Sequence, residues 1–229
     1  MRAGLAILLM APLFGSTVAR ADDLRGVWFS GATVSDSKSV YAGAVVALPG
    51  DRLGSGLAIR ASGNAGEYHY DRLGQPIRAR YLGGEVAAVY QLSGSWGWAN
   101  FSIGPRFTKT SLRPNDASND RRGNRVDLGL QADGARDSAH WRLGWFGSLA
   151  AFDRAYQARI QLGRKIDDHA RLGAELGVQS DRRYTQESAG GFVALPLAGR
   201  AEIQLGAGGS FQHGRAAQPY ASVSVSSVF

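Results

Sequence analysis

The last eleven residues of the chain alternate between apolar and polar side chains. Val223 and Val225 are separated and flanked by Ser222, Ser224 and Ser226. Successive side chains of a β-strand point to opposite faces, so this segment is expected to form a strand with one apolar wall and one polar wall. Such a strand suits a membrane-spanning β-barrel or a soluble β-sandwich, and the rest of the sequence has to decide between them.

The N-terminal segment has the three regions of a secretory signal peptide. Arg2 supplies the positive charge, residues 3–14 are almost entirely apolar, and residues 19–21 (Ala-Arg-Ala) form a small-residue cleavage site. The apolar stretch is shorter than the roughly 20 residues that a membrane-spanning helix needs. We therefore predict a signal peptide over residues 1–21 and a single exported domain over residues 22–229.

Beyond the predicted signal peptide, no apolar run of the sequence approaches the length of a membrane-spanning helix. Such a chain can enter a membrane only as a closed β-barrel, because every backbone N–H and C=O group must be paired there. The sequence ends on Phe229, and an amphipathic last strand with an aromatic end resembles the signal read by the assembly machinery of bacterial outer-membrane barrels. We therefore predict location in the outer membrane, Phe229 as the assembly signal, and the barrel assembly machinery as a partner.

Glycine content and alternation both favour a barrel. The sequence has 31 glycines and 10% aromatic residues, which suits curved and closely packed strands. Segments of alternating polarity recur at residues 126–133, 156–163, 171–179 and 201–212, which is typical of transmembrane barrels. We predict an all-β fold, a single antiparallel transmembrane β-barrel of about twelve strands, with ten to fourteen left open. The strands are expected to start near Val27, Ser39, Gly54, Arg78, Trp96, Arg125, His140, Ala155, Ala170, Ser188, Ala201 and Pro219.

The predicted connections fall into two kinds. Tight connections are expected at residues 49–51, 93–95 and 198–200, and longer polar ones at residues 64–76, 110–124 and 180–187. Outer-membrane barrels have short periplasmic turns and longer external loops, and an even strand number returns both termini to the periplasm. We therefore expect the longer connections to lie outside the cell.

The polar faces of the strands are expected to line the lumen, because the apolar faces must meet lipid. The predicted lumen-lining residues are charged: Glu85, Asp127, Arg142, Arg159, Arg171, Glu175 and Glu202. Mixed charges in a narrow barrel can pair and fill it, or they can line a continuous wet channel. Twelve strands lie between the filled eight-stranded barrels and the open sixteen-stranded ones, so the sequence leaves both alternatives open.

Two predicted external loops carry the remaining candidate residues, which are Tyr68, Tyr70, Arg113, Asp116 and Asn119. The tyrosine rings can stack on sugar rings or pack within the loop, and ordinary packing is favoured. Cations near an anionic surface are attracted to it, so arginines of the second loop are expected to meet the phosphates of lipopolysaccharide. The side-chain oxygens of this loop do not have the spacing of a calcium loop, and we predict no metal site.

Signals for catalysis are weak. The sequence has no cysteine and four histidines, His69, His140, His169 and His213, none in a His-x-Ser arrangement. Outer-membrane lipid hydrolases need a serine with a histidine base. We predict no enzyme and no cofactor. For an exported barrel we also predict no nucleic-acid partner, in spite of a formal charge of +7.

A set of short motifs marks the front half of the chain. They are residues 28–31 (Trp-Phe-Ser-Gly), 41–43 (Tyr-Ala-Gly), 48–51 (Leu-Pro-Gly-Asp), Gly56 with Arg60, 66–70 (Gly-Glu-Tyr-His-Tyr), and the loop from Pro114 through Asn119 to Gly123. Together they resemble the BcsS-type cellulose biosynthesis proteins of Gram-negative bacteria. The resemblance covers residues 27 to about 133, whereas the rear half resembles only barrels in general.

The resemblance implies an outer-membrane accessory protein of cellulose (exopolysaccharide) biosynthesis or secretion. Cellulose itself, or components of its secretion apparatus, would then be partners beside outer-membrane lipid. Two alternatives stay open at this point. One is a small porin-like, structural or adhesive barrel, and the other, less favoured, is an outer-membrane lipid hydrolase.

Overall fold

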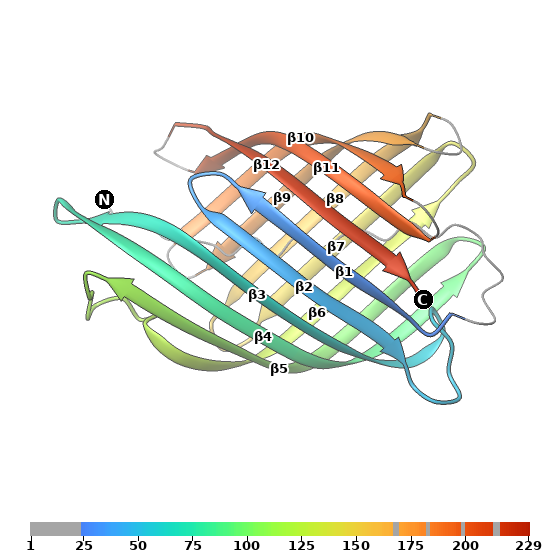
Figure 1. Cartoon of the computed structure of the whole chain (residues 1–229), viewed down its shortest axis with the longest axis horizontal. Coiled ribbons are helices and arrows are strands. Elements are labelled where there is room, and N and C mark those ends of the chain that lie inside the picture. Colours follow the sequence, from blue (N-terminus) through green and yellow to red (C-terminus); the bar gives the residue numbers. More distant parts are fainter. Residues whose placement is uncertain (1–23, 167–169, 182–183, 198–199, 213–215) are drawn as a thin grey trace.

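The computed structural model describes residues 24–166, 170–181, 184–197, 200–212 and 216–229. Within these ranges, twelve antiparallel strands form a closed barrel in which each strand pairs with its neighbours in the sequence (Figure 1). The predicted fold class and strand number are confirmed. The described residues contain no helix that is long and apolar enough to cross a membrane. The predicted signal peptide, residues 1–21, lies outside the described residues.

The strand boundaries agree closely with the predicted ones, because every predicted start lies within four residues of the observed start. The strands are β1 (Gly26–Val34), β2 (Lys38–Ala47), β3 (Gly56–Arg72), β4 (Gln75–Gly94), β5 (Gly97–Arg113), β6 (Gly123–Asp137), β7 (Trp141–Ala150), β8 (Ala155–Lys165), β9 (Arg171–Asp181), β10 (Tyr184–Pro196), β11 (Ala201–Gln212) and β12 (Gln218–Val228).

The barrel closes between its first and last strands. Eight residues of β1 pair with β12, beginning with Val27 opposite Val228. Phe229 extends the seam: its N–H donates to the carbonyl of Gly26 at 2.9 Å, and its own carbonyl accepts from the N–H of Gly26 at 3.0 Å. A Cβ at Gly26 would lie 2.6 Å from Cζ of Phe229. The absence of a side chain at Gly26 therefore makes room for the Phe229 ring.

The outer face carries the apolar belt that a bilayer requires. Ile59, Val86, Ile103, Ile160 and Leu176 point outward from five strands and are 48–63% exposed. Exposed aromatic side chains flank this belt near both ends: Trp28, Trp96 and Trp141 toward the end that holds the C-terminus, and Phe152, Tyr156 and Phe211 toward the other. Two aromatic girdles of this kind mark the two membrane interfaces.

Three strands are longer than a bilayer needs. β3, β4 and β5 have 17, 20 and 17 residues, whereas about 9–11 residues suffice to span a membrane. They extend past the other strands at the end opposite the C-terminus (Figure 1). Leu73 and Gly74, with φ of 50° and 81°, join β3 to β4, as in a two-residue hairpin turn. The long connection predicted over residues 64–76 is therefore wrong, and most of it is strand.

The other predicted long connections are also shorter than expected. β5 continues to Arg113, so the connection to β6 covers only residues 114–122. β9 and β10 pair up to Asp181 opposite Tyr184, which confines their connection to residues 182–183, outside the described residues. Conversely, the β2–β3 connection spans residues 48–55, so the turn predicted at 49–51 is longer than expected. The two ends of the barrel therefore differ less in the lengths of their connections than in how far the strands reach, because β3–β5 extend beyond the others at the end opposite the C-terminus (Figure 1).

The lumen side of β1–β4 differs from the expectation that polar faces line the lumen. Val27, Phe29, Tyr41, Val45 and Val89 belong to one buried apolar cluster there. Because their outward neighbours are also largely apolar, polarity alternation is weak in these strands. One part of the interior is thus packed like a protein core, and buried charged side chains, including Arg60 of β3 and Glu85 of β4, lie beside it.

Candidate functional site in the lumen and at the barrel ends

An ion pair crosses the interior from β3 to β6. Arg60 places Nη2 2.5 Å from Oδ1 of Asp133, and its Nη1 donates to Ser102 at 3.1 Å. Asn100 donates to the other oxygen of Asp133 at 3.0 Å, and Gln91 donates to Asn100 at 3.2 Å. These side chains form a continuous polar layer around the buried pair, in which Nη1 and Nη2 of Arg60 have partners and its Nε has none among the described residues.

A second layer joins β4, β5 and β7. Arg106 lies 2.6 Å from Glu85 through its Nη2 and donates through Nε to the same carboxylate at 2.7 Å. Its Nη2 also donates to Ser148 at 2.9 Å. Glu85, one of the predicted lumen residues, is therefore buried in a charge-assisted contact rather than presented to water.

A third layer centres on Glu175 of β9. Tyr220 donates its hydroxyl to Oε1 of Glu175 at 2.6 Å, and Gln161 donates to Oε2 at 2.6 Å. Arg159 on β8 lies 3.8 Å from the same carboxylate. Tyr220 of β12 and Tyr41 of β2 belong to the same buried cluster of side chains. The layer around Glu175 therefore continues from β8 and β9, through β12, toward the apolar part of the interior.

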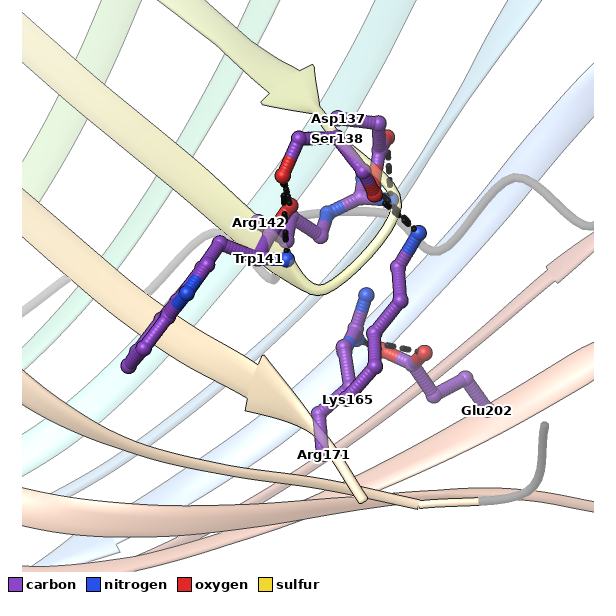
Figure 2. Close-up of polar contacts among 7 residues, drawn as sticks. All are labelled: Asp137, Ser138, Trp141, Arg142, Lys165, Arg171 and Glu202. Atoms are coloured by element: carbon purple, nitrogen blue, oxygen red, sulfur yellow. Dashed lines mark hydrogen bonds and ion pairs between the residues drawn. The ribbon is translucent and has the colours of Figure 1, made fainter. Parts of the chain in front are cut away.

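A fourth cluster lies at the end of the barrel near the C-terminus (Figure 2). Arg142 donates to Asp137 at 3.0 Å, and the Lys165 ammonium lies 3.7 Å from the same carboxylate. Arg171 donates through one nitrogen to both oxygens of Glu202, each at 2.6 Å. The indole of Trp141 in Figure 2 points away from this cluster. These ion pairs tie β6, β7, β8, β9 and β11 together at one mouth.

Asp127 has a different position from the other predicted lumen residues. Its carboxylate accepts the backbone N–H groups of Leu128 at 2.7 Å, Phe152 at 2.9 Å and Asp153 at 2.9 Å. Arg125 forms an ion pair with Asp153 in the same connection. Asp127 therefore anchors the β7–β8 connection, residues 151–154, at the end of the barrel opposite the C-terminus.

The extended tips of β3–β5 carry the residues predicted to lie in loops. Tyr68 and Tyr70 lie on β3 with their rings stacked at 6.1 Å and 27°. Both are buried, so neither ring is presented to a sugar in this structure. The Tyr70 hydroxyl donates to Asp116 at 3.0 Å and accepts from Asn119 at 2.8 Å. The β5–β6 connection thus folds back onto the inner face of the extension.

The outer face of the extension is charged, which places it outside the apolar belt. Glu67 accepts from Arg80 at 2.8 Å and lies 2.5 Å from Arg78. Hydrogen bonds from these two arginines lower the pKa of Glu67 to about 2. Arg113, predicted to lie in a loop, is the last residue of β5 and lies directly opposite Arg78.

Together the lumen layers leave little space for solvent. Arg60 is 2% exposed, and Asp133 and Glu175 are each 3% exposed, although all three carry charges in the interior of the barrel. A water-filled channel along these groups would expose them. In the described residues, the lumen is therefore filled at these levels, and the charges hold the wall strands together.

Several residues that shape the interior were missed by sequence reasoning. Arg60, Asp133 and Arg106 occupy inward positions of their strands and follow the same two-residue period as the predicted set. The two-residue period could have identified all three as inward-facing. The sequence contains no such signal for Tyr41 and Tyr220, because an aromatic residue in a barrel strand can equally well face the lipid.

Solved structures with the same fold come from the bacterial outer membrane. The KdgM porin matches with a TM-score of 0.51 at 12% identity, over 89% of this chain and 99% of that chain. An outer-membrane channel from Pseudomonas putida F1 (COG4313) matches with a TM-score of 0.51 at 13% identity, over 92% and 100%. The β-domain of the Bordetella autotransporter BrkA matches with a TM-score of 0.56 at 14% identity, over 90% and 100%. The protein is therefore an outer-membrane β-barrel.

The family follows from the sequence itself. Residues 27–229 match the family described as cellulose biosynthesis protein BcsS, and the chain belongs to that family. The match includes the rear half, beyond residue 133, where the motifs alone indicated only a generic barrel. No curated protein matches the sequence. The chain is thus an outer-membrane barrel related to cellulose biosynthesis.

Proposed function

We propose that this protein is an accessory of bacterial cellulose secretion that acts at the outer membrane, after the polymer has been made. The family match over residues 27–229 is the observation that carries this proposal. A barrel in the outer membrane is separated from a synthase of the inner membrane, so a direct role in glucose transfer is disfavoured. The role is non-enzymatic, and we assign no catalytic residue.

The filled interior supports a role in contact rather than in conduction. The layers around Arg60, Glu85 and Glu175 join strands from several sides of the barrel, and a cellulose chain is wider than the water that they exclude. The barrel would then meet the polymer or the secretion apparatus through its ends. The charged mouth around Arg142 and Arg171, and the extension of β3–β5, are the candidate contact regions.

A small porin remains the second candidate, because porins and channels share the fold. It predicts stable open channels from refolded protein in planar bilayers, which the filled lumen disfavours.

A lipid hydrolase has less support. Of the two histidines in the described part of the chain, His69 is exposed and pairs with Glu67 at 3.7 Å, and His140 is exposed in the β6–β7 turn. His169 and His213 lie outside the described residues.

The proposal is tested by deleting the gene in a cellulose-producing host and measuring cellulose on the cell surface. Synthase activity in inner-membrane vesicles is the control. We expect surface cellulose to fall, synthase activity to stay unchanged, and the wild-type gene to restore the surface polymer. Unchanged surface cellulose would remove the proposed role.

A further inference from the structure

A groove runs along the lipid-facing side of β2, β3 and β4. It has a volume of about 620 Å³ and is lined by the small residues Ala42, Ala44, Ala61, Gly63 and Gly84, with Phe107 of β5 at its border. The two glycines lie opposite each other in the β3–β4 pair. A Cβ at either would meet only a backbone oxygen at 3.6 Å. The groove therefore exists because Gly63 and Gly84 lack side chains, and the backbone at these glycines has an ordinary conformation.

A cluster of exposed cations begins where the groove ends. Lys109 is the next outward residue after Phe107 on β5, about 7 Å farther along the strand. Arg80 follows Gly84 on β4 after one intervening outward residue, Leu82. Farther along the same two strands, Arg78 and Arg113 face each other in register. Four cations therefore lie on two neighbouring strands just beyond an apolar groove.

The negative groups on this face do not cancel the cluster. Glu67 forms ion pairs with Arg78 and Arg80, and Asp71 lies nearer the tip of the hairpin, opposite Pro76. Lys38 of β2 faces Glu67 from the other side. Glu67 thus fixes the two arginine side chains in place, and the face keeps a net positive charge.

A second groove on the lipid-facing side lacks the combination of apolar groove and neighbouring cations. It has a volume of about 770 Å³, lies over β4–β7, and is lined by residues such as Tyr90, Ile103, Leu130 and Leu149. Among the described residues, no charged side chain lines it. This groove suits the acyl chains of ordinary bilayer lipid, whereas the first of these two grooves continues, within the described residues, into a cationic cluster.

We propose that the groove over β2–β4 and the cations Lys109, Arg113, Arg80 and Arg78 form a binding site for one phosphorylated lipid of the outer leaflet, with lipid A as the occupant. The groove takes an acyl chain, and the cations take the phosphates of the headgroup. The extension lies at the end opposite the C-terminus and the start of β1 (Figure 1), which is the external end of a barrel whose first and last strands meet on the periplasmic side. This site is independent of the cellulose-related role.

The test is native mass spectrometry of the refolded barrel in detergent with bisphosphorylated lipid A, dephosphorylated lipid A, or phosphatidylglycerol. We expect one bisphosphorylated lipid A to remain bound, and affinity at least tenfold lower for the other two lipids. The charge reversal Lys109→Glu with Arg113→Glu should lower lipid A affinity by about tenfold or more. Its matched control, Arg136→Glu with Arg164→Glu, reverses two exposed charges near the opposite end and should bind as wild type.

A substitution that fills the groove gives a second test variant, in which the charges of the cationic cluster are unchanged. Gly84→Val adds side-chain volume in the groove without a steric clash, and it should reduce lipid A binding. Gly147→Val is its control, because Gly147 lines the second groove and a Cβ there would approach no atom closer than 3.9 Å. Equal binding of phosphorylated and dephosphorylated lipid A, wild-type binding by both test variants, or equal binding of phosphatidylglycerol would overturn the proposal.

Discussion

Arg60 of β3 and Asp133 of β6 form an ion pair inside the barrel, with Nη2 and Oδ1 2.5 Å apart and side chains that are 2% and 4% exposed. The pair spans two intervening strands. A buried pair is costly to form, and removing one partner leaves an uncompensated charge. Its hydrogen bonds to Ser102 and Asn100 explain how the barrel tolerates it.

Asp133→Ala is expected to destabilise the folded barrel by about 3–5 kcal/mol, because Arg60 would remain charged and buried without its counterion. The measurement is urea unfolding of the protein in lipid vesicles. Asp71→Ala is the control, since Asp71 is exposed near the tip of β3, and its effect should stay within about 0.5 kcal/mol. An Asp133→Ala variant as stable as the control would contradict the buried ion pair.

The wild-type barrel is expected to give no stable open channels in planar bilayers, because side chains fill its lumen. Tyr41 and Tyr220 contribute two buried rings to that filling. Replacing both by alanine should produce measurable conductance, at a cost in stability of about 3–5 kcal/mol for each ring. Heat-modifiable migration in electrophoresis checks that the double variant is folded. Steady conductance by the wild type would contradict the filled lumen.

Phe229→Ala is expected to lower the fraction of protein that assembles in the outer membrane. Two features motivate this prediction: Phe229 directly follows the last strand, and its ring packs against Gly26 of β1, where a Cβ would lie 2.6 Å from Cζ of Phe229. Phe211→Ala is the matched control, since Phe211 is 48% exposed and Phe229 is 50% exposed. The readout is the folded fraction in outer-membrane preparations. Equal losses in the two variants would remove any special role of Phe229.

Glu67 is expected to titrate with a pKa of about 2 in the folded protein, because Arg78 and Arg80 hydrogen-bond its carboxylate. Its pKa in the unfolded chain is about 4.3. A lowered folded pKa gives a contribution to stability that is complete above about pH 4.3 and is lost as pH falls through about 2. The ¹³C shift of the carboxylate reports the midpoint directly. Arg78→Gln with Arg80→Gln should move that midpoint upward, and an unchanged midpoint would show that the arginines are not the cause.

Much of the fold could be predicted from the sequence, because strand alternation and turn residues are local signals. The rear strands show this best: Val223 and Val225 face outward, and Ser224 and Ser226 face inward. The failure at residues 64–76 has a clear cause. Polar residues alternate there with Tyr68 and Tyr70, which is the pattern of a strand whose outer face is exposed to water. A search for strands with a lipid-facing apolar side misses this pattern.

The candidate site was less predictable. The inward positions of Glu85, Arg159 and Glu175 follow from the two-residue period, but their partners do not. Which charge meets which depends on the register and curvature of distant strands, as the Arg60–Asp133 pair shows. The apolar lining of β1 and β2 could not be foreseen either, because Val27 and Phe29 are as compatible with lipid as with an internal core.

The most direct test of the proposed role compares surface cellulose with synthase activity in the same deletion strain. We expect surface polymer to fall while synthase activity in inner-membrane vesicles stays at the wild-type level. Complementation with the wild-type gene should restore the polymer, which excludes an effect on neighbouring genes. If surface cellulose and synthase activity are both unchanged, or if both fall together, the barrel does not act on cellulose after its synthesis.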